Sequence, residues 1–435
     1  MKSAAPSVLA EAVALARHAA RLGWRFLPAA GFWVLAGQTA NLLAGQASTL
    51  LGADQRVWAT LVFVAGVIVW IGCLVLAVHA FEPGLQNLAR PGLPGSIVPG
   101  QTRMEALTAA TGPVLAVYAA WGLVEEQVSE LLQANLAVHG IDAQLFSIDL
   151  GKADFYLWLA LGAWVARLVL RRWTAWRPSA AATLVGLLAE GTFVFALFVA
   201  LRTGWRLAFD WLTTRQVWHW IAAGWDGFVA LLPPWRIWFS LTLPELVRDL
   251  GRRVWTWLVP GFGTAVLLPL MWIALVATVF GWREFRARDL VAGTAAAHVP
   301  DALTSRVQAQ GRRHPLLAVA GWLTRDLRDK YLPVLAALRL VGAAGLRFAG
   351  AFLVLVAANA LLWNRMDDLL TMLLGPRPFA ATLGTIPLQN LIVGFFTTTS
   401  QLAIFAAAFD RALAAAPAQP AGFTSTTSAG LENRR

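Results

Sequence analysis

The sequence predicts an all-α polytopic integral membrane protein of about eight transmembrane helices plus amphipathic interfacial helices. Three observations indicate this class: 58% of the 435 residues are hydrophobic, 14% are charged, and the mean hydropathy is +0.60. A soluble chain of this length cannot bury so much apolar surface. The single cysteine excludes a disulfide-stapled scaffold and a cysteine metal cluster.

Stretches without Asp, Glu, Lys or Arg are candidate spans, because a bilayer-crossing helix needs about 20 largely apolar residues. Val57–Phe81 is the clearest. Arg167 lies near the end of another span, where its long side chain is expected to reach the lipid headgroups. Phe26–Ala53 could be a span or a buried interfacial hairpin, and we favour a span. The eight expected spans are Phe26–Gln46, Val57–Phe81, Ala106–Val124, Ala153–Leu170, Pro178–Leu201, Pro260–Trp282, Phe348–Trp363 and Leu388–Phe409.

These spans divide the chain into seven segments. They are a cytoplasmic amphipathic N-terminal helix (1–25), transmembrane helices 1–5 with short loops (26–201), external Trp-rich interfacial helices (202–259), transmembrane helix 6 (260–282), a basic cytoplasmic segment (283–347), transmembrane helices 7–8 (348–411) and a disordered cytoplasmic tail (412–435). Glu11, Arg17 and His18 interrupt the apolar core that a secretory signal would require.

The distribution of basic residues predicts the orientation. With eight spans and both termini in the cytoplasm, 24 of the 35 lysines and arginines lie on the cytoplasmic side. An odd number of spans would place either the basic N-terminus or residues 283–347 outside, against the positive-inside rule. The expected location is the bacterial inner membrane. The net charge of +11 is therefore interpreted as an orientation signal, not as a nucleic-acid surface.

The external segment between Leu201 and Pro260 contains nine of the 22 tryptophans. One apolar stripe is expected from Leu207 to Leu232, and a second amphipathic helix begins near Pro244. Tryptophan favours the headgroup zone, so both helices are expected in the outer interface. They could simply cap the bundle or form a docking surface for a lipid, a glycan or a partner protein. The candidate interface residues are Trp211, Trp218, Trp225 and Trp257.

The basic segment 283–347 is expected to form a helix on the cytoplasmic membrane surface, with anionic lipid as its counterion. A cytosolic protein partner is the alternative. The segment is too short for a catalytic domain.

Glu190 is the strongest functional candidate, because it lies midway between Arg177 and Arg202 and so near the bilayer midplane. A carboxylate at that depth costs about 2.5–3.5 kcal/mol to insert, which favours a position facing other helices. Polar residues of two other spans are expected at similar depth and could complete one polar layer around it. This layer would bind a substrate or ion through Glu190, Gln38, Asn41, Thr398, Ser400 and Gln401. Alternatively, Thr398, Ser400 and Gln401 only hydrogen-bond between helices.

The sequence contains no motif of a known catalytic class. A Gly-rich phosphate loop, a Ser nucleophile elbow and histidines at metal-ligand spacing are all missing, and the six histidines are scattered. No catalytic residue, cofactor or metal site is predicted. Two functional hypotheses remain open. The first is a transporter or permease-like component centred on Glu190. The second is a non-catalytic membrane scaffold or subunit of a membrane complex.

Overall fold

The computed structural model describes residues 8–51, 54–88, 127–129, 131–132, 153–176, 180–233, 235–238, 241–280 and 344–415. These residues are mainly helical, with one short antiparallel pairing of β1 (Arg236–Trp238) with β2 (Leu241–Thr242). Within the described residues, five helical segments are long and apolar enough to cross a membrane, and they include parts of the second, fifth, sixth, seventh and eighth expected spans. They are Arg56–Gly84, Leu184–Thr213, Leu243–Ala277, Leu346–Leu374 and Gly384–Ala415.

The prediction of eight spans is therefore shown only in part. The first and fourth expected spans are helical but are not among these five. The third, Ala106–Val124, lies outside the described residues, as do residues 283–343 of the cytoplasmic segment and residues 416–435 of the tail.

The N-terminal region forms one helix, α1 (Val8–Leu51), where the sequence predicts a surface helix followed by a span. Leu15, Ala19 and Leu22 are buried at helical spacing, so the first turns pack on the rest of the protein. Pro28 lies inside α1 without ending it. A membrane protein tolerates such a proline where neighbouring groups satisfy the freed carbonyl.

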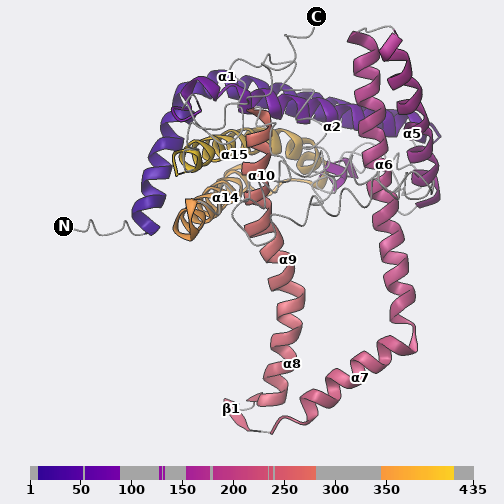
Figure 1. Cartoon of the computed structure of the whole chain (residues 1–435), viewed down its shortest axis with the longest axis vertical. Coiled ribbons are helices and arrows are strands. Elements are labelled where there is room, and N and C mark those ends of the chain that lie inside the picture. Colours follow the sequence, from indigo (N-terminus) through magenta and orange to yellow (C-terminus); the bar gives the residue numbers. More distant parts are fainter. Residues whose placement is uncertain are drawn as a thin grey trace, which may run out of the picture.

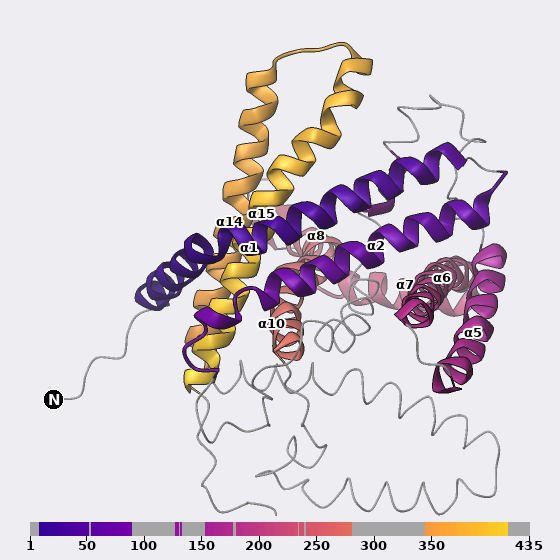
Figure 2. The same ribbon diagram turned by 90° about the horizontal axis from the view of Figure 1, so that it is seen from above.

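Small residues bring α1 against α2 (Arg56–His79), and Figure 2 shows these two helices side by side. A Cβ atom placed on Gly37 of α1 would lie 2.6 Å from the Cβ of Cys73. A Cβ on Gly66 of α2 would lie 2.5 Å from the Cβ of Ala44. Both contacts are too short for a side chain, so glycine at these positions permits the close approach of the backbones.

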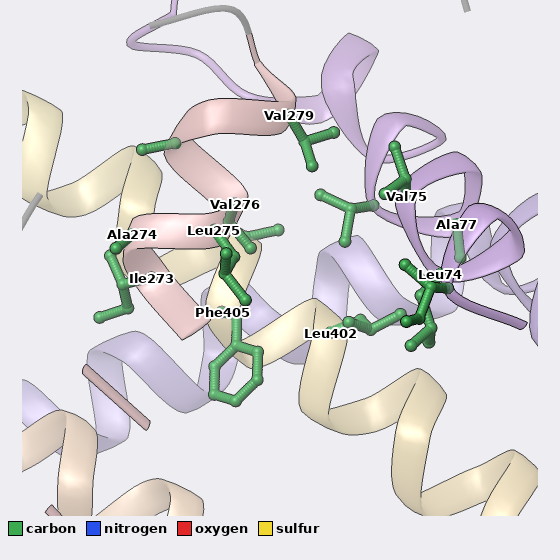
Figure 3. Close-up of a cluster of buried hydrophobic side chains, with 14 of the residues drawn as sticks. Leu74, Val75, Ala77, Ile273, Ala274, Leu275, Val276, Val279, Leu402 and Phe405 are labelled. Atoms are coloured by element: carbon green, nitrogen blue, oxygen red, sulfur yellow. The ribbon is translucent and has the colours of Figure 1, made fainter. Parts of the chain in front are cut away.

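The core lies where α2 meets α10 (Leu268–Val279) and α15 (Phe379–Ala415). Figure 3 shows α2 residues such as Leu74 facing α10 residues such as Val276, with Leu402 and Phe405 of α15 between them. Rings of α10 and α15 stack, and the Trp272 and Phe405 centroids are 5.8 Å apart. α15 continues through Ala415, so the expected tail begins at least four residues later than 412. Alanine is the strongest helix former, and Ala412 is fully buried.

Helix α14 (Leu346–Leu374) forms an antiparallel hairpin with α15, and the hairpin extends beyond the other helices in Figure 2. The seventh span was expected to end at Trp363, but α14 continues beyond it and includes Asp367. Its Oδ1 accepts a hydrogen bond from Nε2 of Gln389 at 2.7 Å, which joins the two helices.

Helices α5 (Ala153–Trp176) and α6 (Ala180–Thr213) form a second hairpin, which packs on α2 through α6. The span predicted to end at Leu201 continues to Thr213, because no helix-breaking residue separates residues 201–213 from it. The chain then turns into α7 (Gln216–Ala230).

The chain returns through β1, β2 and α8 (Leu243–Arg253). The helix then continues through π-helical Val254–Leu258, α9 (Val259–Phe262), π-helical Gly263–Leu267 and α10. Thus α8 and the sixth expected span form one continuous helix. Figure 1 shows a loop that reaches away from α1, α2 and α15. It consists of the lower part of α6, then α7, the paired strands β1 and β2, and α8. We call residues 202–258 the arm.

Candidate functional site

Glu190, the leading candidate from sequence, pairs with Arg167 across the α5–α6 hairpin. Nη2 of Arg167 lies 3.3 Å from Oε1 of Glu190. The Arg167 side chain is 6% exposed and that of Glu190 is 24% exposed. In such surroundings each charge offsets much of the desolvation penalty of the other.

The expectation that Arg167 reaches the headgroups is wrong. Its side chain is buried, and its Nε atom has no hydrogen-bond partner among the described residues. The physical reason is the antiparallel packing of α5 on α6, which places a carboxylate in reach of the guanidinium. Attraction between opposite charges is strongest where water is excluded.

The register of the hairpin also gives the position of the pair along the two helices. Arg167 precedes the end of α5 by nine residues, and Glu190 follows the start of α6 by ten. At 1.5 Å per residue, both lie about 15 Å from the α5–α6 connection. The midplane position of Glu190 stays a prediction from the sequence.

An apolar groove of about 480 Å³ runs beside the ion pair, between α2, α5 and α6. Its lining includes Ala166 and Ala189, each adjacent in sequence to a member of the pair, but neither Arg167 nor Glu190 lines it. Thr192 contributes a buried hydroxyl without a hydrogen-bond partner in the part of the chain that the structure describes. The groove is therefore a poor route for water or ions to the carboxylate.

Gln38 and Asn41 lie on α1, which packs on α2, α14 and α15. The Gln38 side chain lies against Gly394 of α15, and its Oε1 has no hydrogen-bond partner within the described ranges. Nδ2 of Asn41 donates to Oε1 of Gln127. These contacts join α1 to other segments, and neither of them involves Glu190.

The polar run of α15 is mainly engaged within the hairpin. Ser400 Oγ accepts a hydrogen bond from Nε1 of Trp363 on α14 at 3.0 Å and donates to the carbonyl of Phe396 at 2.7 Å. The hydroxyls of Thr397 and Thr399 likewise donate to carbonyls one turn earlier. Thr398 and Gln401 are half-buried. The Ser400 contact favours the interhelical role over a ligand site.

The contacts of the described residues do not join these candidates into one polar layer. Glu190 lies in a hairpin that packs on α2, whereas Gln38 lies against α15, Asn41 against α2 and Ser400 against α14. Equal predicted depth does not imply proximity, because depth follows from position along each helix but proximity depends on which helices are neighbours.

A buried polar cluster that sequence reasoning missed ties α1 to α15. Asp410 is 3% exposed. Its Oδ1 accepts from the backbone N–H of Asn87 at 2.8 Å, and its Oδ2 lies 3.2 Å from both Nδ2 of Asn87 and Nε2 of His18. Nearby, Nε of Arg411 lies 3.3 Å from Oε1 of Glu11.

These groups line a cavity of about 420 Å³. The signal available in the sequence was an aspartate directly after the apolar run Leu402–Phe409. The hydrogen bonds of Asp410 account for its burial, so the cluster is interpreted as structural.

The four candidate tryptophans lie on three elements of the arm. Trp211 is on α6 beneath the Arg215 guanidinium, which is 4.2 Å from its ring centroid. Trp218 and Trp225 are on α7, where Trp218 meets Phe209 edge-on at 5.5 Å and Trp225 lies against Gly251 of α8. Trp257 lies beyond α8 and is 79% exposed. The stripe expected from Leu207 to Leu232 is interrupted at Thr214–Arg215, where the helix breaks.

Among the described residues, no group of three or more His, Cys, Asp and Glu side chains could hold a metal ion. The chain matches no known protein family, no curated protein and no solved structure.

Proposed function

We propose that this protein is a non-catalytic membrane-embedded subunit or scaffold, and that its arm binds a partner protein. The observation that supports this most is the exposure of large aromatic side chains along the arm. Trp205, Trp220, Trp255 and Trp257 are all more than two-thirds exposed. Exposed apolar patches of this kind typically mark interaction sites.

Local contacts hold the arm in shape without covering these rings. Thr242 and Glu245 form a capping box at the start of α8, and Nη2 of Arg248 lies 3.2 Å from Oδ1 of Asp226 on α7. Trp225 against Gly251 adds a second contact between α7 and α8. A preorganised aromatic surface loses little conformational entropy on binding, which favours recognition.

The cellular placement is part of the proposal. The apolar helices are compatible with a membrane protein. The excess of arginine at the N-terminus and in residues 283–347 supports the bacterial inner membrane with both termini in the cytoplasm. The arm would then lie outside. Anionic lipid at the cytoplasmic face remains the expected counterion of the basic segment.

The test is affinity purification of the full chain in mild detergent, with a photo-crosslinking residue at position 220. We expect one protein to crosslink and to copurify at fixed stoichiometry. Replacing Trp255 and Trp257 by alanine should weaken this association about 30-fold, since interface tryptophans are frequent hot spots worth 2 kcal/mol or more. Trp24→Ala is the control, because Trp24 is 85% exposed on α1, outside the arm. Equal loss in both variants, or a crosslink only to lipid, would contradict the proposal.

Transport is the second candidate function. Its support is the pairing of Arg167 with Glu190, a carboxylate that the sequence predicts near the bilayer midplane, where ionisable residues often belong to ion or substrate paths. The apolar lining of the adjacent groove is evidence against transport, because such a groove is a poor route for water or ions. Under this hypothesis Glu190→Gln abolishes substrate or proton flux in reconstituted vesicles while the protein stays folded. Unchanged flux in a folded Glu190→Gln protein would exclude the carboxylate from such a role.

A further inference from the structure

We propose that the groove between α2, α5 and α6 holds one acyl chain of a phospholipid whose phosphate is bound by Arg56. This inference rests on the membrane placement of the helices and is independent of the partner proposed for the arm.

The shape of the groove suits a single hydrocarbon chain. On α5 the lining residues recur at three or four positions from Phe155 to Leu170, which places them on one helix face about 22 Å long. The groove has a volume of about 480 Å³ and a lining that is mainly apolar, so a flexible hydrocarbon chain can follow it at van der Waals contact.

Small residues create this space. Gly162, Ala163, Ala166 and Ala189 line the groove where α5 faces α6. A Cβ atom placed on Gly162 would meet no atom within 4 Å, so the position opens into the groove. An empty apolar channel of this size would forfeit dispersion contacts, and lipid chains are the apolar molecules available to a membrane helix.

A cation marks one end of the groove. Arg56 immediately precedes Val57, which lines the groove, and its guanidinium lies 5.9 Å from the centroid of Phe155, another lining residue. Nε of Arg56 is buried and has no hydrogen-bond partner in the described part of the chain. The residue as a whole is half-buried, and arginine binds phosphate through paired donors.

The neighbouring charges specify the headgroup. Asp54 lies two residues before Arg56, Asp154 precedes Phe155, and both are exposed. A purely anionic headgroup would face these carboxylates, whereas a phosphoethanolamine carries an ammonium group that they attract. The occupant we infer is therefore a diacyl phosphatidylethanolamine.

The test uses the full chain reconstituted in vesicles of equal parts phosphatidylethanolamine and phosphatidylglycerol, then released in mild detergent for native mass spectrometry. We expect one phosphatidylethanolamine to be retained. Gly162→Leu should reduce retention about 10-fold by filling the groove, and Arg56→Gln about 5-fold. Gly186→Leu is the matched control, since a Cβ at Gly186 also meets open space but Gly186 does not line the groove. Equal retention by the Gly162 and Gly186 variants would overturn the proposal.

Two further measurements cover other outcomes. A phosphatidylethanolamine with a diazirine on its acyl chain should label peptides of α5 in the unmodified chain, so the proposal stays testable if Gly162→Leu does not fold. Labelling only outside α5 would contradict the proposal.

The second measurement compares Thr192→Val with Arg56→Gln. If Thr192→Val rather than Arg56→Gln abolishes retention of an apolar ligand, the phospholipid assignment is wrong. The occupant is then a molecule with a deep hydrogen-bond acceptor, such as a quinone.

Discussion

The helix-packing region around α1, α2, α10 and α15 and the arm are both rich in apolar residues, yet they differ in how those residues are used. In the packing region, glycine and alanine let helices approach, and α15 is buried at every position from Leu402 to Phe409. In the arm, most of the tryptophans whose burial the structure describes are exposed, with Trp255 at 72%. Small residues permit contact between helices, whereas a single layer of large rings cannot bury itself.

The polar contacts follow the same division. In the helices outside the arm, charged groups such as Asp410 of α15 and Arg167 of α5 are buried and have specific partners. In the arm, the ion pair of Arg248 with Asp226 is about half exposed. The difference predicts that equivalent substitutions have large effects in the packed helices and small ones in the arm.

The largest effect is expected from breaking the buried ion pair of α5 and α6. Arg167→Met should lower the free energy of unfolding by about 4 kcal/mol, because it leaves Glu190 without its cationic partner. The measurement is thermal unfolding in detergent. Arg167→Met combined with Glu190→Leu should regain most of the loss, and a double variant as unstable as the single one would contradict the pairing.

Overpacking the α1–α2 contact should have the next largest effect. Gly66→Leu is expected to destabilise the protein by about 3 kcal/mol, since any added side chain meets Ala44. Gly224→Leu in the arm is the control, because a Cβ there meets nothing within 4 Å. Chemical denaturation followed by tryptophan fluorescence compares the two. Equal stability would show that α1 and α2 are not in close contact.

Removing the acceptor of the α1–α15 cluster should have an intermediate effect. Asp410→Ala is expected to cost about 2 kcal/mol, because the buried Asn87 N–H and the His18 ring lose their common partner. Hydrogen exchange should then increase in residues near 87 and in the last turns of α15. Unchanged protection there would indicate that the cluster does not hold these segments together.

The smallest effect is expected for the exposed ion pair in the arm. Asp226→Ala should change the unfolding free energy by about 0.5 kcal/mol or less, since solvent screens an exposed pair. The same unfolding measurement applies. A loss comparable to that of Arg167→Met would mean that the arm is much better packed than its exposure indicates.

Much of the fold was accessible from local sequence. Long apolar stretches predicted α2, most of α6 and the helical parts of 260–282, 348–363 and 388–409, because helix formation and apolar character are local properties. The ends of the helices were harder to predict. No residue within 8–51 or 243–279 ends the helix, although the amphipathic pattern favoured two segments in each case.

The candidate site was predicted less well. Glu190 was identified from its charge within an apolar segment, but Arg167 was assigned to the surface because its position near a predicted span end was the only information available. The Asp410 cluster was missed, since His18, Asn87 and Asp410 are separated by up to 392 residues. The proximity of these groups depends on which helices pack together.

By itself, the sequence determined that the chain is apolar and helical, that its arginines are unevenly distributed, and that one carboxylate lies within a long apolar segment. These properties depend on composition and on spacing along a helix. The tertiary structure alone decided that Glu190 faces Arg167, that the other polar candidates contact different helices, and that an open groove runs from Val57 along α5. The reason is geometric: helix periodicity orients a side chain about its own axis, whereas the neighbouring helix that it meets is set by packing across the whole chain.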